Sequence, residues 1–140
     1  MDNKDIEIIS ILKQNSRETI KEIARKTKLR PSTVHQRLKK LSASGAIEKF
    51  TVKLNDKLAG ENFIVLVLVK GSTAEYIDKG AINDPHIKEI FGVTGEHDLL
   101  IKMKFGSIDE FNKFILKFRN RKGIQSTITM VATAVLKEEI

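Results

Sequence analysis

Side chains that can form hydrogen bonds recur along one face of the segment spanning residues 30–45. Thr33, Gln36, Arg37 and Lys40 fall at positions i, i+3, i+4 and i+7, as on one side of a helix. Arginine pairs well with guanine, and glutamine with adenine, in the major groove of DNA. A short helix with such donors is therefore suited to reading base edges. The alternative is an ordinary amphipathic surface helix whose charged side is simply hydrated.

On the DNA hypothesis, the basic and polar side chains divide into two groups of contacts. Bases would be contacted by Thr33, Gln36 and Arg37, with His35 at the margin and Ser32 in the same DNA-binding set. Phosphates, which set the register and the salt dependence of binding, would be contacted by Arg17, Lys28, Arg30, Lys39 and Lys40.

A second run of polar residues is Thr94-Gly95-Glu96-His97-Asp98. An amino-acid ligand needs N–H donors for its carboxylate and a negative partner for its ammonium group. Backbone amides around Gly95 would supply the donors, and Asp98 would supply the negative charge. The simpler alternative is a hairpin turn, in which Gly95 adopts a positive φ and Asp98 bonds to nearby backbone.

The positive charge of the chain is concentrated in its first part. Residues 1–60 contain 14 Lys and Arg against 7 Asp and Glu, whereas residues 61–140 contain 11 of each. Between Arg17 and Lys40 there are 9 basic residues and 2 acidic ones. A field of this sign is typical of a site for a polyanion such as double-stranded DNA. The difference between the halves predicts two units with different tasks.

Composition and motifs argue against several classes of protein. The chain has no cysteine, and His35, His86 and His97 lack the spacing of metal ligands. There is no nucleophile motif and no phosphate-binding loop, so we expect neither an enzyme nor a metal or other cofactor. No apolar run approaches the ~20 residues that span a bilayer, and the first residues lack the order of a signal peptide. We expect a cytoplasmic protein with no membrane partner.

Three predicted helices position the candidate DNA-binding residues. Residues 2–14 have apolar side chains at helical spacing, and Thr19 with Glu22 has the spacing of a capping box at the start of a second helix. The third helix follows after a short connection, which is typical of a helix-turn-helix. Its apolar stripe consists of Val34, Leu38 and Leu41.

Residues 46–52 alternate between polar and apolar types after Gly45, and we expect a strand there. Residues 1–52 are therefore predicted to be a winged helix-turn-helix DNA-binding domain. The polar stretch 53–61 is predicted to be a linker, because it contains Asn-Asp and Gly and the charge balance changes there.

Residues 62–140 predict a second domain with alternating strands and helices. The expected strands are 63–69, 86–94, 99–105 and 124–136, and the expected helices are 74–82 and 107–120. The apolar face of the second helix would consist of Ile108, Phe111, Ile115 and Phe118. The order β-α-β-β-α-β is the ferredoxin-like pattern. The overall fold class is thus α+β, with a winged helix-turn-helix followed by a ferredoxin-like βαββαβ domain.

The first predicted strand is apolar on both sides, and the last alternates small apolar residues with threonine. A sheet with two apolar faces and helices on only one of them needs a second cover. The simplest cover is the same sheet of another copy about a two-fold axis, which predicts a homodimer.

Four stretches, taken in order, resemble the Lrp/AsnC family of leucine-responsive, or feast/famine, regulators. They are residues 5–12, residues 29–41, Gly45-Ala46-Ile47 and residues 93–100. The chain departs from the family at Arg30, where a small or capping residue is usual, and at His97, where tyrosine or phenylalanine is usual.

The resemblance implies a sequence-specific transcription regulator that is modulated by a small effector, such as an amino acid, and that assembles into dimers and an octamer or another assembly of dimers. It also implies that the turn at residues 94–98 lies between dimers, where a neighbouring copy would close the effector pocket, either with its last strand (Thr127, Thr129 and Thr133) or with the first helix of its second domain (Tyr76). Two alternatives remain: an architectural DNA-binding protein without effector, and a βαββαβ enzyme or RNA-binding module with a basic extension. Against RNA binding, the third predicted strand offers only Phe105 for base stacking.

Overall fold

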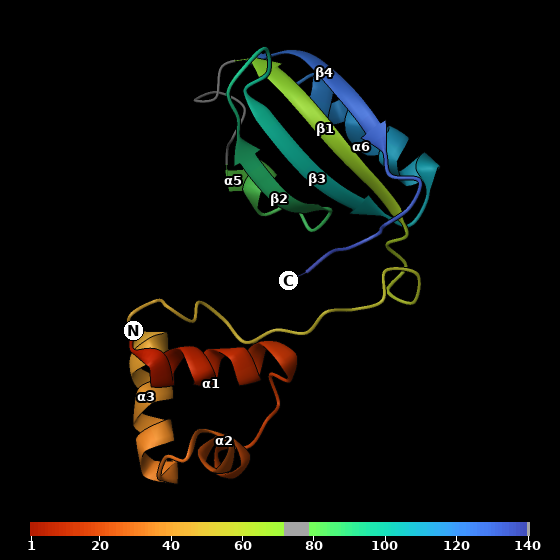
Figure 1. Ribbon diagram of the computed structural model, residues 1–140. Helices are drawn as coiled ribbons and strands as arrows, with labels where there is room; N and C mark the ends of the chain where they lie inside the picture. Colours follow the sequence, from red (N-terminus) through yellow and green to blue (C-terminus); the bar gives the residue numbers. More distant parts are fainter. Residues whose placement is uncertain (72–78, 140) are drawn as a thin grey trace. The chain divides into compact units, whose positions relative to one another are not determined.

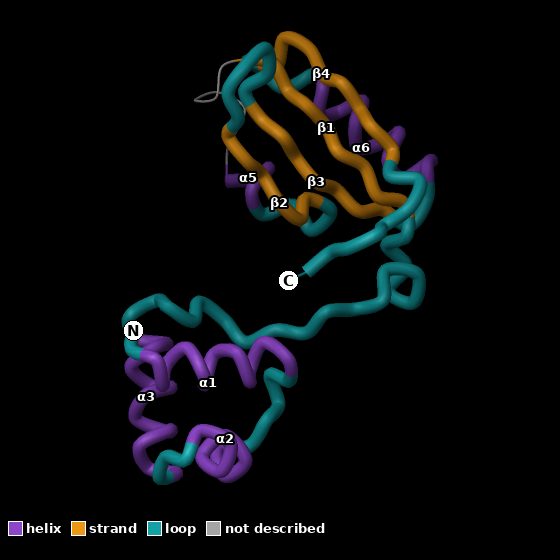
Figure 2. Tube along the Cα trace, viewed as in Figure 1, coloured by secondary structure: helices purple, strands orange, loops and turns teal. Residues whose placement is uncertain are grey.

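The computed structural model describes residues 1–71 and 79–139. The chain divides into two compact units, residues 1–53 and 54–139 (Figures 1 and 2). The first unit consists of helices, and the second combines strands with helices. Each unit has a hydrophobic core of its own.

The helical unit consists of α1 (Asn3–Gln14), α2 (Ile20–Thr27) and α3 (Pro31–Ala43). All three predicted helices are confirmed. The turn between α2 and α3 begins at Lys28, which has a left-handed backbone with φ of 57°. Arg30 stands at the N-cap of α3, but its side chain makes no capping hydrogen bond.

The first two helices begin at side-chain caps, of which the sequence predicted the one at Thr19. Asp2 accepts a hydrogen bond from the Asp5 amide, and the Asp5 side chain accepts one from the Asp2 amide, which completes a capping box. Thr19 Oγ1 accepts a hydrogen bond from the Glu22 amide at 3.2 Å. These bonds satisfy amides that would otherwise lack a partner at each helix start.

The core of the helical unit is small. Ile8 of α1, Ile23 and Ala24 of α2 and Val34 of α3 are buried together. The side chains packed around them are Ile11, Leu12, Ile20, Leu29 and Leu38. Each helix contributes at least one buried residue, so the outer surface of α3 is held in place by contacts with both other helices.

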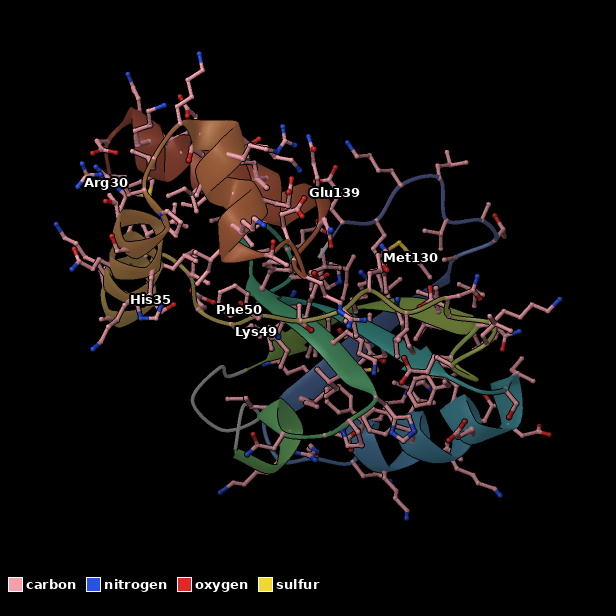
Figure 3. All side chains as sticks on the ribbon, turned by 90° about the horizontal axis from the view of Figure 1, so that it is seen from below. Arg30, His35, Lys49, Phe50, Met130 and Glu139 are labelled. Atoms are coloured by element: carbon pink, nitrogen blue, oxygen red, sulfur yellow. The ribbon has the colours of Figure 1, made fainter. Side chains whose placement is uncertain are left out.

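Residues 46–52 do not form the predicted strand, and the segment has no regular secondary structure. Phe50, labelled in Figure 3, and Val52 are 57% and 66% exposed. A strand must pair its backbone N–H and C=O groups with a neighbour. None of the four described strands pairs with this segment. The prediction is wrong for the single chain because the alternation of side chains specifies no pairing partner.

The second unit contains one antiparallel sheet in the order β2-β3-β1-β4. Its strands are β1 (Phe63–Gly71), β2 (Ile87–Gly92), β3 (Leu99–Phe105) and β4 (Ile124–Val131). The helices α5 (Lys79–Ile82) and α6 (Ile108–Arg119) lie on one face of the sheet (Figure 1). This arrangement confirms the ferredoxin-like prediction. Of the predicted helix 74–82, residues 74–78 lie outside the described residues.

The end of β4 and the buried face of α6 differ from the sequence prediction, and β2 is shorter at both ends than the predicted strand 86–94. β4 ends at Val131 rather than at Leu136, because β1, its neighbour among the described strands, begins at Phe63 and the last paired backbone bond joins Ala132 to Ile64. In α6, Ile108 is 56% exposed and does not belong to the buried face. Phe114 packs against the core in its place, between Phe105 and Phe118.

The strand register separates two faces of the sheet. Val65, Val67 and Val69 of β1 are fully buried beneath the helices. The opposite face, which we term the open face, carries the alternate residues: Leu66 and Leu68 of β1, with their register partners Leu100 of β3 and Ile128 and Met130 of β4. Ile128 and Met130 are 48% and 42% exposed.

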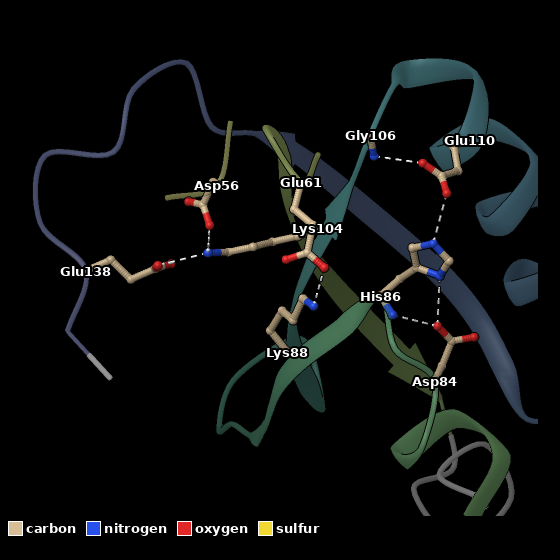
Figure 4. Close-up of polar contacts among 9 residues, drawn as sticks. All are labelled: Asp56, Glu61, Asp84, His86, Lys88, Lys104, Gly106, Glu110 and Glu138. Atoms are coloured by element: carbon tan, nitrogen blue, oxygen red, sulfur yellow. Dashed lines mark hydrogen bonds and ion pairs between the residues drawn. The ribbon is translucent and has the colours of Figure 1, made fainter. Parts of the chain in front are cut away.

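One end of the open face is charged (Figure 4). Lys104 of β3 is buried, and its Nζ lies 2.7 Å from Asp56 Oδ1 and 2.8 Å from Glu138 Oε1. Burial alone lowers the pKa of Lys104, but its hydrogen bonds with the two carboxylates outweigh burial and raise this pKa. Lys102 pairs with Glu138 as well. Residues 54–61 thus belong to the sheet unit by their contacts.

Candidate nucleic-acid interface and effector site

The face of α3 opposite its buried residues is exposed and polar. Val34 and Leu41 face the core, and Ser32, Gln36 and Lys39 lie on the other side at spacings of four and three residues. This outward stripe is rotated from the predicted one, because Thr33 and Arg37 lie on the flank of the helix and are partly buried. The structure therefore brings Ser32, Gln36 and Lys39 together as the side presented to solvent, with His35 and Lys40 beside it.

Arg37, predicted to contact a base, is instead engaged within the helical unit. Its Nη1 donates to Asp2 Oδ1 at 2.8 Å, to Asp2 Oδ2 at 2.7 Å and to Asp5 Oδ1 at 2.8 Å. Its side chain is only 28% exposed. The physical reason is that the capping box places two carboxylates at the start of α1, directly beside this flank of α3. Arg37 thus joins α3 to α1 and is not on the outward stripe.

Both aspartates are stabilised as anions. The backbone amide of Asp5 and then the Arg37 guanidinium lower the pKa of Asp2, and the amide of Asp2 and then Arg37 lower the pKa of Asp5. Asp2 and Asp5 were missed as functional positions. The sequence signal for them is the spacing of two aspartates at a predicted helix start. Their carboxylates can cap the helix and also pair with a cation from another helix.

The predicted phosphate contacts are all at the surface. Arg17, Lys28, Arg30, Lys39 and Lys40 are exposed. Lys28 and Arg30 flank Leu29 in the turn between α2 and α3, and Arg30 immediately precedes α3 (Figure 3). Because Arg30 makes no capping bond, its guanidinium is available to a phosphate near the start of the helix, where the helix dipole also favours an anion.

The turn at residues 94–98 joins β2 to β3 and is tied to the end of β1. Gly95 has φ of +112°, as the sequence predicts. The Asp98 amide donates to Val69 O at 2.8 Å, and Asp98 Oδ2 accepts from the Gly71 amide at 2.8 Å. Asp98 therefore organises the turn through one carboxylate oxygen. Thr94 and Glu96 are exposed and His97 is half-buried.

The other predicted effector residues that the structure describes, which the resemblance places on a neighbouring copy, lie on β4 and just after it. Thr127 pairs with Val69 and so lies at the same end of the sheet, where its Oγ1 accepts from Arg119 Nε at 3.1 Å. Thr129 Oγ1 is buried, without a hydrogen-bond partner in the described part of the chain. Thr133 follows β4 at the opposite end of the sheet. Tyr76 lies outside the described residues.

Two sequence families match the two units. The family described as winged helix-turn-helix DNA-binding matches residues 1–48, and the Lrp/AsnC ligand binding domain matches residues 62–140. The chain belongs to the Lrp/AsnC family. It is a DNA-binding transcription regulator with a ligand-binding domain, and not an enzyme. The resemblance noted in the sequence is thereby confirmed.

The similarity to individual members of the family extends over nearly the whole chain. The HTH-type transcriptional regulator FL11 of Pyrococcus furiosus is 32% identical over 140 residues, which cover 99% of this chain and 93% of that protein. The structure of LrpC from B. subtilis superposes with a TM-score of 0.87 at 26% identity and covers 99% of both chains. A transcriptional regulator from Neisseria meningitidis, solved as a complex with L-Met, has the same fold, with a TM-score of 0.91 at 24% identity over 99% of this chain and 94% of that one.

Within residues 1–71 and 79–139, no helix is both long and apolar enough to cross a bilayer. Nor do three or more His, Cys, Asp or Glu side chains in these residues come together in a way that could hold a metal ion.

Proposed function

We propose that this Lrp/AsnC regulator binds a specific DNA sequence as a homodimer and that an amino acid modulates its binding or assembly. The observation that carries the proposal is the outward stripe of Ser32, Gln36 and Lys39 on α3, held in place by a core shared among three helices. Glutamine can form two hydrogen bonds with adenine, and a lysine can contact guanine or a phosphate. The helical unit carries the positive field that attracts DNA.

A binding experiment tests the reading role of Gln36. The preferred sequence is first selected from a random duplex pool, and the affinities of wild type and Gln36→Ala are then compared on it. We expect a loss of about 1–3 kcal/mol on the selected site and little change on random DNA. Gln14→Ala is the control, because Gln14 is also exposed but ends α1. Equal affinity of Gln36→Ala and wild type on the selected site would count against α3 as the reader.

The open face of the sheet supports the proposed homodimer. Its apolar residues include Leu66, Leu68 and Leu100, which are only half-buried, and the more exposed Ile128 and Met130. Together they form an apolar surface on one side of the sheet, and a second copy would remove it from water. A two-fold axis through this surface would pair identical faces and supply two helix-turn-helix units for one operator.

The effector is proposed to be an amino acid that binds at the turn containing Gly95 and Asp98. The complex of the Neisseria meningitidis regulator with L-Met supports this class of ligand. A ligand shared between dimers would change the assembly only if it bound one assembly more tightly than another. Its effect on DNA binding would then follow from the number and spacing of helix-turn-helix units in each assembly.

Thermal unfolding with each of the twenty common amino acids tests this part of the proposal. A true effector present at 100 times its Kd should stabilise the protein by about 2.7 kcal/mol. Asp98→Asn should remove this stabilisation, because it deletes the negative charge but keeps an oxygen acceptor for the Gly71 amide. The control is Asp109→Asn, which makes the same chemical change at an exposed position in α6. Footprinting that showed no defined repeat, together with no stabilising amino acid, would favour an architectural protein without effector.

A further inference from the structure

A hollow of about 330 Å³ lies beside α6, at the turn that leads into β2. Asp84 and His86 line it from the turn, and Lys113, Phe114 and Lys117 line it from α6. It is formed within a single chain. His86 directly precedes β2, whereas the turn at residues 94–98 follows β2, so the two places lie at opposite ends of that strand.

The acidic groups of the hollow are already bonded to the protein (Figure 4). His86 Nδ1 lies 3.0 Å from Asp84 Oδ1, and His86 Nε2 lies 3.1 Å from Glu110 Oε1. Glu110 Oε2 accepts from the Gly106 amide at 2.7 Å, and this bond and then His86 lower the pKa of Glu110. The His86 ring stacks on Phe105 with 4.7 Å between centroids. The side of the hollow nearest β2 is thus a fixed wall.

Two of the basic groups that line the hollow, Lys113 and Lys117, are not bonded in this way. Lys113 and Lys117 are one turn apart on α6 and exposed, and neither forms an ion pair with any residue that the structure describes. Between them Phe114 contributes an aromatic surface, stacked on Phe118 with 5.8 Å between centroids. Two unpaired ammonium groups beside an aromatic surface suit a ligand with an anionic end and an apolar end.

We infer that this hollow binds a small organic carboxylate, with its carboxylate on Lys113 and Lys117 and its apolar part against Phe114. The volume is at the lower end of that of small-molecule pockets and fits a metabolite of amino-acid size. The site goes beyond the proposed function, because it is separate from the turn at residues 94–98 and its ligand need carry no ammonium group. A 2-oxo acid meets these requirements as well as an amino acid does.

Isothermal titration calorimetry on the full chain tests the inference, with phenylpyruvate, L-phenylalanine and inorganic phosphate as probes. Phenylpyruvate should bind, and the double variant Lys113→Gln/Lys117→Gln should weaken its binding about tenfold or more, since two charged hydrogen bonds are lost. The control Lys57→Gln/Lys122→Gln removes the same charge from exposed lysines elsewhere in the sheet unit and should bind as wild type does. Asp98→Asn should also bind phenylpyruvate unchanged.

Several results would overturn the inference. They are absence of phenylpyruvate binding to wild type, equal binding by the Lys113/Lys117 double variant, and binding of phosphate as tight as that of phenylpyruvate, which would remove the role of the apolar surface. Loss of binding in Asp98→Asn alone would also overturn it, but would leave the proposed effector turn standing. DNA affinity is measured in a separate experiment, so a failure to bind phenylpyruvate would not argue against the role of α3 in DNA recognition.

Discussion

The different surroundings of Lys39 and Arg37 make a quantitative prediction about salt. Lys39 lies on the outward stripe of α3, whereas Arg37 is bonded to Asp2 and Asp5. The five exposed cations assigned to phosphates give a slope of log K against log salt of about −4.5 for one chain and about −9 for a dimer. Lys39→Gln should change the slope of the dimer to about −7, because each chain loses one phosphate contact.

Arg37→Gln should leave the slope of the dimer near that of wild type and should instead lower the thermal stability of the helical unit, since Asp2 and Asp5 lose their cation. Fluorescence anisotropy with the selected duplex over a range of potassium concentrations measures both slopes. The two variants remove the same charge from the same helix, so each is the control for the other. If Arg37→Gln changed the slope as much as Lys39→Gln does, Arg37 would leave the aspartates for a phosphate, and the reasoning would be refuted.

Three more predictions follow from burial and charge. Ile23→Ala should destabilise the helical unit by about 2–5 kcal/mol, because Ile23 is fully buried in a small core, and should abolish DNA binding while the sheet unit still binds its ligand by calorimetry. Because folding lowers the pKa values of Asp2 and Asp5, the two carboxylates stabilise the fold at pH values above 3.8, their usual pKa, and this stability is lost as the pH falls through the lower pKa values of the folded state. Circular dichroism should therefore show acid unfolding that is less steep in Asp2→Asn than in wild type. Ile128→Lys, on the open face, should convert the homodimer to monomers in sedimentation equilibrium without lowering the melting temperature of the sheet unit.

Strong local patterns predicted most elements of the fold. The apolar run that became β1 and the alternation that became β3 lie within a few residues of their predicted bounds. The end of β4 was not predictable in the same way, because it depends on where β1 begins rather than on the composition of residues 132–136. The missing strand at residues 46–52 has a similar cause, since pairing depends on a partner that alternation does not identify.

The candidate DNA site shows the same limit at the level of side chains. Helical spacing correctly assigns Val34 and Leu41 to the buried face of α3, but the polar stripe predicted from it is rotated, because Thr33 and Arg37 lie on the flank of the helix. Spacing does not reveal that Arg37 meets Asp2, which is 35 residues away in the sequence. The turn at residues 94–98 was likewise predictable from Gly95, whereas the bond from the Gly71 amide to Asp98 required the register of the sheet.

The charged end of the open face adds a constraint on the proposed homodimer. Lys102 and Lys104 lie on the face that a second copy would cover, and Glu138 pairs with both of them. Glu138→Gln would leave these lysines less neutralised, and desolvating a charge without a partner is costly. We therefore expect this variant to dimerise about tenfold more weakly in sedimentation equilibrium, since about 1.4 kcal/mol corresponds to that factor.

The control is Glu139→Gln, because Glu139 is exposed and pairs only with Lys137 among the described residues. Equal dimer affinity of Glu138→Gln and Glu139→Gln would show that the second copy does not cover the lysines, and would move the dimer contact to the apolar end of the open face alone.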